Sequence, residues 1–209
     1  MEGALDPRRA PGPVARNDQR RARIIAALRE CMLARGYAAT SLSDVARAAG
    51  MTPSHLLYYF KGKDAILNAY WEATAAAVLA RLHAIESEPI ERRLELLADA
   101  FFSGVIATQA DIGIVLEFFG LAVHDKDLYR TKARFDREIK VWLARLIAQS
   151  PRPLGALVDS AAEAVYALLM GLCTAAYFDE RLGTPQAREI FLMLLRQIAG
   201  FDEPLAMRK

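Results

Sequence analysis

Residues 36–67 read GYAATSLSDVARAAGMTPSHLLYYFKGKDAIL. Gly36 follows an apolar helical pattern and suits the left-handed position just after a helix, where glycine is unstrained. Ser41 is a typical N-cap residue, and Asp44 three positions later resembles the second half of a capping box. The pattern therefore predicts that one helix ends before Gly36 and that a short second helix begins after Ser41.

A second short helix is predicted directly after a tight turn. Gly50 permits the turn, Thr52 is a suitable N-cap, and Pro53 occupies the first helical position, where its missing N–H costs nothing. The new helix covers residues 53–60, with Leu56 facing the core. Two short helices joined by a glycine-containing turn are typical of a helix-turn-helix, whose second helix presents its N-terminal residues to DNA bases.

The residues left outside this apolar pattern suit a nucleic-acid surface. Hydroxyls at helix starts can bind phosphates, a histidine and phenols can contact bases or backbone, and lysines supply positive charge. The predicted DNA contacts are Ser41, Thr52, Pro53, Ser54, His55, Tyr58, Tyr59, Lys61 and Lys63.

The stretch contains, in order, Gly36-Tyr37, Thr40-Ser41, Val45-Ala46, Ala48-Ala49-Gly50-Met51-Thr52, Leu56, Tyr58-Tyr59-Phe60, Lys63-Asp64 and Leu67. This order resembles the N-terminal signature of TetR-family transcriptional regulators over about thirty positions. The family usually has Tyr, a phosphate contact, where this chain has Leu57, and often Gly at Ser54. The resemblance implies a cytoplasmic, DNA-binding repressor that binds a palindromic operator as a homodimer. It also implies a body whose cavity binds a small effector that releases the DNA.

The charge distribution agrees with a DNA-binding N-terminal part. Residues 1–63 contain eleven Lys/Arg and five Asp/Glu, a net charge of +6, whereas residues 64–209 contain sixteen and twenty, a net charge of −4. A basic third joined to an acidic remainder is expected of a DNA-binding head on a body that does not contact DNA. The first thirty residues have no apolar core typical of a secretory leader, and no membrane span is predicted.

The fold expected from helical periodicity is all-α, with about nine helices and no strand. Residues 1–17, rich in Pro, Gly and Arg, are expected to be a disordered basic extension whose arginines either reach DNA or stay solvated. Residues 18–63 form the expected helix-turn-helix domain, residues 64–200 a helical effector-binding and dimerisation domain, and residues 201–209 a tail.

The last two predicted helices, about 154–180 and 184–200, carry more apolar surface than one neighbour can cover. A helix that is apolar on two sides must be covered on two sides, so we expect a homodimer through a four-helix bundle. The alternative is a monomer in which all apolar faces of these two helices are buried within the single chain. The predicted interface residues are Val165, Leu168, Leu172, Ala176, Phe191, Leu194, Leu195 and Ile198.

No catalytic or metal site is predicted. The histidines His55, His83 and His124 lack metal-ligand spacing, and no phosphate loop, nucleophile elbow or cofactor motif is present. Large side chains of the middle helices are instead expected to line a mostly apolar effector cavity. Glu117, amid apolar residues, either pairs with an arginine, anchors a ligand or points to solvent. The predicted effector residues are Phe101, Phe102, Glu117, Phe118, Trp142, Tyr166 and Met170.

Two other functions remain open at this point. One is a regulator without an effector, whose body serves only for dimerisation. The other is a helical small-molecule carrier or enzyme that keeps the head as a scaffold.

Overall fold

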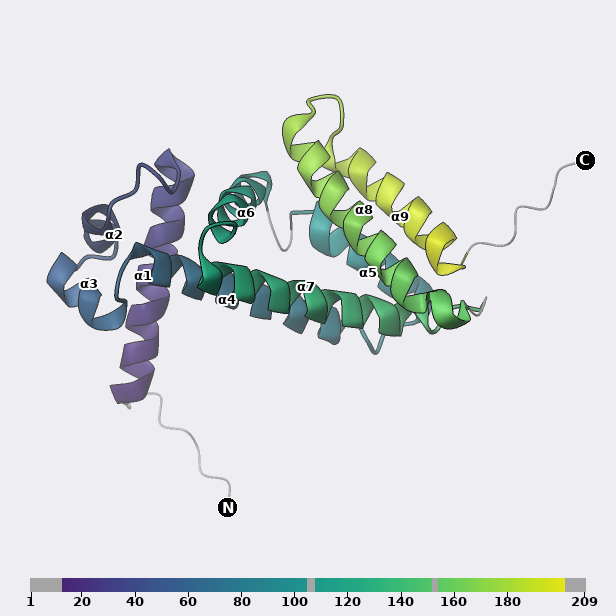
Figure 1. Cartoon of the computed structure of the whole chain (residues 1–209), viewed down its shortest axis with the longest axis horizontal. Coiled ribbons are helices and arrows are strands. Elements are labelled where there is room, and N and C mark those ends of the chain that lie inside the picture. Colours follow the sequence, from purple (N-terminus) through teal and green to yellow (C-terminus); the bar gives the residue numbers. More distant parts are fainter. Residues whose placement is uncertain (1–12, 105–107, 152–153, 202–209) are drawn as a thin grey trace, which may run out of the picture. The chain divides into compact units, whose positions relative to one another are not determined.

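The computed structural model describes residues 13–104, 108–151 and 154–201, and these parts contain nine α-helices and no strand. Figure 1 labels the helices. The all-α prediction is confirmed. The chain divides into two compact units at Tyr70/Trp71, seven residues beyond the expected boundary. We call described residues up to 70 the head and residues 71–201 the body. The helices are α1 (Pro13–Arg35), α2 (Leu42–Ala48), α3 (Pro53–Tyr59), α4 (Lys63–Ala84), α5 (Ile90–Phe102), α6 (Gln109–Ala122), α7 (Lys126–Ile147), α8 (Val158–Phe178) and α9 (Thr184–Ala199).

The first helix begins earlier than expected. α1 starts at Pro13, whereas residues up to 17 were predicted to be disordered. Proline at the first position of a helix costs no hydrogen bond. Residues 1–12, which contain Arg8 and Arg9 of the expected basic extension, and the tail residues 202–209 lie outside the described part of the chain.

The capping residues and the turn glycines of the helix-turn-helix adopt the conformations that the sequence predicts. Ser41 and Asp44 form a reciprocal capping box at α2, and Thr52 caps α3 by accepting a hydrogen bond from the backbone of His55. Gly36 and Gly50 both adopt positive φ, 76° and 65°. These glycines end α1 and α2 in a conformation that other residues rarely adopt.

A small apolar core holds the three head helices together. Residues of α1, α2, α3 and the start of α4 are fully buried in it, so the short helices α2 and α3 depend on packing more than on intrinsic helix propensity. The core includes Ile24, Leu28, Val45, Ala46, Ala49, Leu56, Ile66 and Leu67.

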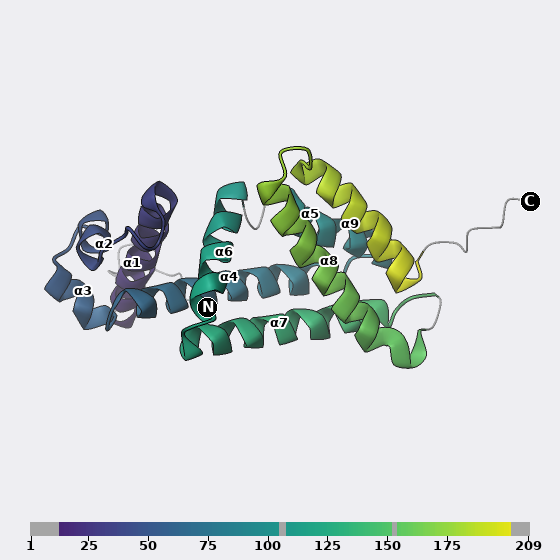
Figure 2. The same cartoon turned by 45° about the horizontal axis from the view of Figure 1, so that its top comes forward.

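The body is a layered helical bundle. α8 and α9 lie side by side in Figures 1 and 2, α8 also packs against α7, and α9 also packs against α5. A capping box between Thr108 and Asp111 starts α6, and the side chain of Asp125 caps α7. Trp71 of α4 stacks on Phe118 of α6, with ring centroids 4.3 Å apart.

The helical segment that ends with α8 carries unusually exposed apolar surface. Residues 155–178 are long and apolar enough to cross a membrane by length and composition, and their most apolar 18-residue stretch has a mean hydropathy of 1.5. Only 22% of the most apolar 18-residue stretch is buried within the chain. The sequence predicted a buried helix here, whereas in the single chain much of the apolar surface of this helix is exposed to solvent.

Candidate nucleic-acid interface

The N-terminal half of α3 presents its polar side chains to solvent. Thr52, Pro53, Ser54 and His55 are all exposed, whereas Leu56 is fully buried. Burial of Leu56 fixes the rotation of the helix, because residues on one helical face share a direction. The exposed face therefore contains the residues that a helix-turn-helix uses to contact bases.

The two tyrosines near the end of α3 differ in their surroundings. Tyr58 is 80% exposed, and the neighbouring Leu57 is 47% exposed. Tyr59 is half-buried, and its hydroxyl accepts a hydrogen bond from Arg20 of α1 at 2.9 Å. Arg21 donates to the Tyr59 carbonyl at 2.8 Å. Tyr59 therefore anchors α3 to α1, and Tyr58 is the phenol available to a ligand.

An aromatic contact also orients His55. Its ring lies 5.4 Å from the Tyr59 ring, and its Nε2 is 3.5 Å from the Tyr59 hydroxyl. Tyr58 meets Tyr59 edge to face at 5.2 Å. Side chains held by their neighbours lose less conformational freedom when they bind a partner. Through their contacts with Tyr59, the His55 imidazole and the Tyr58 phenol are both held on the exposed surface of α3.

The N-terminus of α2 is occupied by a carboxylate of the protein itself. Asp44 accepts hydrogen bonds from the Ser41 backbone N–H at 3.0 Å and from the Ser41 hydroxyl at 2.5 Å. These bonds lower the pKa of the Asp44 carboxyl, and Arg35 and Arg47 lie 3.5 and 3.2 Å from it. Ser41 was predicted to contact DNA, and the structure places its hydroxyl in this cap.

Lys61 and Lys63 occupy different environments. Lys61 is exposed. Lys63 donates to the carbonyls of Tyr37 and Thr40 at 2.8 and 2.7 Å, and its Nζ lies 4.0 Å from the centroid of the Tyr37 ring. Two neutral oxygens and an aromatic face thus hold this ammonium within the head.

The comparison with known families agrees with the geometry of the head. Residues 24–70 match the model of the bacterial regulatory proteins of the tetR family, and residues 89–200 match the C-terminal model of BetI-type transcriptional repressors. The chain belongs to the TetR family. It is accordingly a DNA-binding transcriptional regulator of the repressor type and not an enzyme.

Individual relatives extend over most of this TetR-family chain. The HTH-type transcriptional regulator BetI of Escherichia coli O17:K52:H18 is 29% identical over 179 residues, covering 82% of this chain and 89% of that protein. A solved transcriptional regulator from Pseudomonas aeruginosa PAO1 is 21% identical, covers 87% of this chain and 91% of its own, and has a TM-score of 0.75. A regulator from Rhodococcus sp. RHA1 is 20% identical, covers 88% and 99%, and has a TM-score of 0.74. The two structures establish the similarity of fold.

The body of the regulator contains a partly open apolar cavity of about 90 Å³ between α4, α5, α6, α7 and α8. Its wall is made of aromatic and aliphatic side chains together with two threonines and a cysteine. Burial raises the pKa of the Cys173 thiol in this wall to about 12, so this group stays protonated and neutral. The lining residues are Trp71, Thr74, Ala75, Val78, Phe101, Ile112, Val115, Leu116, Phe119, Phe135, Met170, Cys173 and Thr174.

The predicted effector residues only partly coincide with this wall. Phe101 and Met170 line the cavity. Phe102, Phe118, Trp142 and Tyr166 are buried but lie outside its lining, because periodicity identifies a buried helical face without saying whether a void lies against it. Glu117 is exposed on α6 and is not among the residues that line the cavity. Trp71, Phe119 and Phe135 line the cavity and belong to the large side chains of the middle helices, but they were not among the predicted effector residues.

The predicted dimer residues divide into two groups. Val165, Ala176, Phe191 and Leu195 are buried within the single chain, where they pack against its other helices. Leu168, Leu172, Leu194 and Ile198 are partly exposed. The outer apolar surface of α8 and α9 consists of these four residues with Ala164, Ala167, Gly171, Ala175, Phe178, Ile190 and Met193.

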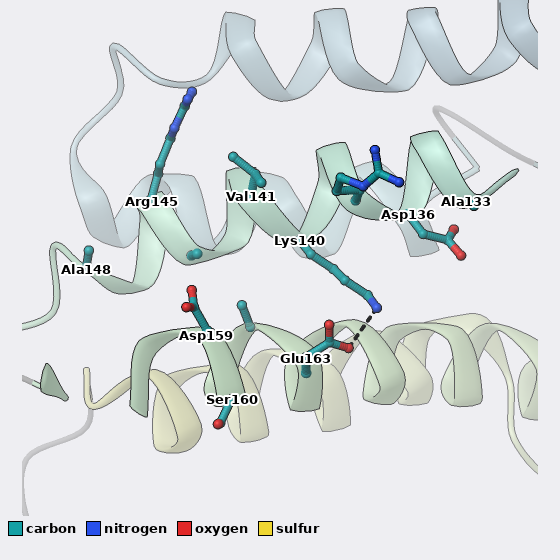
Figure 3. A pocket seen from close by; sticks show the side chains of 12 residues that line it. Ala133, Asp136, Lys140, Val141, Arg145, Ala148, Asp159, Ser160 and Glu163 are labelled. Carbon is teal, nitrogen blue, oxygen red and sulfur yellow. Dashed lines mark ion pairs between the residues drawn. The ribbon is translucent and has the colours of Figure 1, made fainter. Parts of the chain in front are cut away.

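An open groove of about 810 Å³ separates parts of α7 and α8. Figure 3 shows Lys140 of α7 reaching across to Glu163 of α8, and the two charged groups are 2.7 Å apart. The lining includes three basic and three acidic side chains, so their formal charges cancel. The charged residues are Asp136, Arg137, Lys140, Arg145, Asp159 and Glu163.

Proposed function

We propose that this TetR-family repressor binds a palindromic operator as a homodimer, and that a small apolar molecule in the body cavity releases it. The observation that carries the proposal is the exposed polar face of α3, held in a fixed orientation by a buried Leu56 and by Arg20 and Arg21 on Tyr59. In this proposal each head inserts α3 into a major groove.

The role of α3 is tested by binding of the purified protein to DNA from its own upstream region, measured by fluorescence anisotropy. His55→Ala is expected to weaken specific binding by about 1–3 kcal/mol, the value of a good base contact. The matched control is His83→Ala, which removes another exposed histidine, on the body side of α4. Equal DNA affinities of the wild type and both variants would show that His55 does not contact the operator.

Support for the homodimer comes from the exposed apolar surface of α8 and α9. Phe178 is 69% exposed and Met193 is 57% exposed, and both lie on this surface. Contiguous exposed apolar surface is typical of an interaction site in a soluble protein. Two copies that pair these helices form a four-helix bundle, which covers the surface of each chain with the same surface of the other.

Support for an effector comes from the apolar cavity. A ligand that binds only one of two body conformations increases the population of that conformation. If that conformation binds the operator weakly, the ligand lowers the affinity for DNA. By linkage, operator DNA must weaken ligand binding by the same factor. Titration of a ligand with and without operator checks this reciprocity.

The size of the cavity favours a second candidate, a repressor without an effector. Its 90 Å³ is well below the roughly 300–1,000 Å³ of common ligand sites. Phe119, Met170 and Thr174 line both the cavity and an open surface hollow of about 750 Å³ beside α8. Movement of Phe119 and Met170 would join the two spaces. The effector-controlled repressor is favoured if a ligand larger than the cavity binds there and lowers operator affinity. The second candidate is favoured if none of a broad set of ligands binds or raises the melting temperature.

A further inference from the structure

The apolar cavity and the open hollow beside α8 share part of their walls. Phe119 of α6 and Met170 and Thr174 of α8 line both the cavity of about 90 Å³ and the hollow of about 750 Å³. Each of these three residues is only partly buried in the single chain. Their side chains therefore form the boundary between the two spaces.

The boundary is held by contacts between side chains. The Phe119 ring meets the Trp71 ring edge to face at 5.9 Å, and Nζ of Lys132 lies 4.3 Å from its centroid. Lys132 is itself held by Asp136, at 2.5 Å. Met170 is unbranched, so it adapts its shape by rotation about three bonds. Rotation of Phe119 and Met170 would therefore join the cavity to the hollow.

The hollow lies on the face of α8 that the single chain leaves uncovered. Besides the shared boundary, its lining includes Gly171, Ala175 and Phe178. These residues are spaced by four and three positions, so they lie on one face of the helix. The same face continues toward the start of α8 through Ala167 and Ala164, which are exposed. In the proposed dimer the second copy therefore lies over the hollow.

The relief and charge of this face suit a second copy of the chain. Phe178 is 69% exposed, whereas Gly171 has no side chain, and a Cβ added there would meet nothing within 4 Å. The surface thus carries both a protruding ring and a depression, as an interface between two identical surfaces requires. Among the described residues that line the hollow, Asp179 alone is charged, so covering the hollow desolvates little charge.

We propose that each ligand site is shared between two chains: the cavity and the hollow join into one space, and the second copy forms its outer wall. The inference rests on the proposed homodimer and on the proposed effector role of the body. Apolar side chains dominate the lining of both spaces, so the ligand is a neutral, mostly apolar molecule longer than the cavity. A ligand in this position touches the dimer interface, so ligand binding and dimerisation are coupled.

Two neutral probes of different size distinguish a shared site from a cavity within one chain. Xenon enters small apolar cavities, whereas biphenyl-4-methanol has two linked rings and needs both spaces. Binding of each probe is measured from NMR shifts of the Val78 and Val115 methyl groups, which line the cavity. In the wild type, bound biphenyl-4-methanol is expected to show nuclear Overhauser effects to Val115 and also to Ala175, which lines the hollow but not the cavity.

The variant Met193→Glu removes the second copy without changing the site, because Met193 is exposed on α9 and is not among the residues that line the cavity or the hollow. Biphenyl-4-methanol is expected to lose at least about tenfold in affinity, since one side of its rings would face water. Xenon should bind both proteins alike. Met193→Leu is the matched control and should bind both probes like the wild type. By linkage, biphenyl-4-methanol should also lower the concentration at which the wild type becomes dimeric.

Sedimentation velocity and operator binding of the same samples separate failure of the site from failure of the proposed function. If the wild type is a monomer, the proposed dimer and the shared site both fail. If the wild type is a dimer, three outcomes overturn the shared site alone: biphenyl-4-methanol does not contact both Val115 and Ala175, it binds Met193→Glu equally well, or xenon binding is lost together with it. If the shared site is occupied but operator affinity is unchanged, the site stands and the release mechanism fails.

Discussion

At the scale of single residues, two lysines two positions apart serve different parts of the head. Both Lys61 and Lys63 were predicted to contact DNA from their charge and their place beside α3. Lys61 is exposed, whereas Lys63 donates to the Tyr37 and Thr40 carbonyls. The first is suited to a phosphate, and the second joins the loop after α1 to the start of α4.

Replacement of Lys63 by Met is expected to destabilise the protein by about 1–3 kcal/mol, since two backbone acceptors lose a charged donor while the apolar stem is kept. Urea unfolding measures this loss. The matched variant Lys61→Met should unfold like the wild type and instead bind all DNA sequences more weakly, with a smaller salt dependence. An unchanged unfolding midpoint for Lys63→Met would contradict the structural role.

The capping box of α2 makes a pH-dependent contribution. Hydrogen bonds from Ser41 lower the pKa of Asp44 below its usual 3.8. A lowered folded-state pKa stabilises the protein above the usual value, and this stabilisation is lost as the pH falls through the folded pKa. Asp44→Asn should therefore be less stable than the wild type near neutral pH, by a margin that narrows below about pH 3.8. A margin unchanged into strong acid would contradict this assignment.

What the sequence can predict at this scale depends on the range of the interaction. Ser41–Asp44 and Thr52–His55 are local contacts within one helical turn, so short spacings predicted the caps at Ser41 and Thr52. The inward position of Lys63 depends on Tyr37, which is 26 residues away, and the boundary that Phe119 and Met170 form between the cavity and the hollow depends on how α6 and α8 meet. Residue type and spacing contain no information about those positions.

At the scale of elements, the turn between α2 and α3 sets the geometry of the helix-turn-helix. Gly50 has φ of 65°, and a Cβ there would lie 2.6 Å from Nη2 of Arg23 on α1. The turn is therefore constrained both by its own backbone and by the neighbouring helix. The sequence predicted the glycine turn, but not the contact with Arg23.

Gly50→Ala is expected to destabilise the protein by at least about 1–2 kcal/mol, because a left-handed conformation is strained for alanine and Arg23 must move. Thermal unfolding measures the change, and DNA affinity should fall with it. Gly120→Ala is the control, since this glycine lies inside α6 with nothing within 4 Å of the added Cβ. It should be neutral or stabilise by up to about 1 kcal/mol. Equal stability of Gly50→Ala and the wild type would contradict a requirement for glycine at the turn.

At the scale of the whole molecule, the exposed apolar surface of α8 and α9 supports the proposed dimer. Periodicity located two apolar stripes on these helices but did not indicate which stripe faces inward. Val165 and Phe191 are completely buried within the chain, and Met193 is exposed. The faces are decided by packing against α5 and α7, which are distant in sequence.

Met193→Glu is expected to convert the proposed dimer into a monomer at micromolar concentration, because the carboxylate of each chain would have to be desolvated without a partner. Sedimentation velocity measures the change in mass. Val123→Glu is the control, since Val123 is 74% exposed at the end of α6 and lies outside the α8–α9 surface. A wild-type protein that sediments as a monomer would contradict the proposed dimer.

Selection of bound DNA from a random double-stranded library tests the central claim most directly, because it examines DNA binding, symmetry and half-site spacing together. The expected product is a palindrome whose half-sites lie one helical turn or slightly more apart. His55→Ala should then lose preference at defined positions within each half-site. Enrichment of no sequence, or of a single unpaired half-site, would contradict a dimeric repressor that binds through α3.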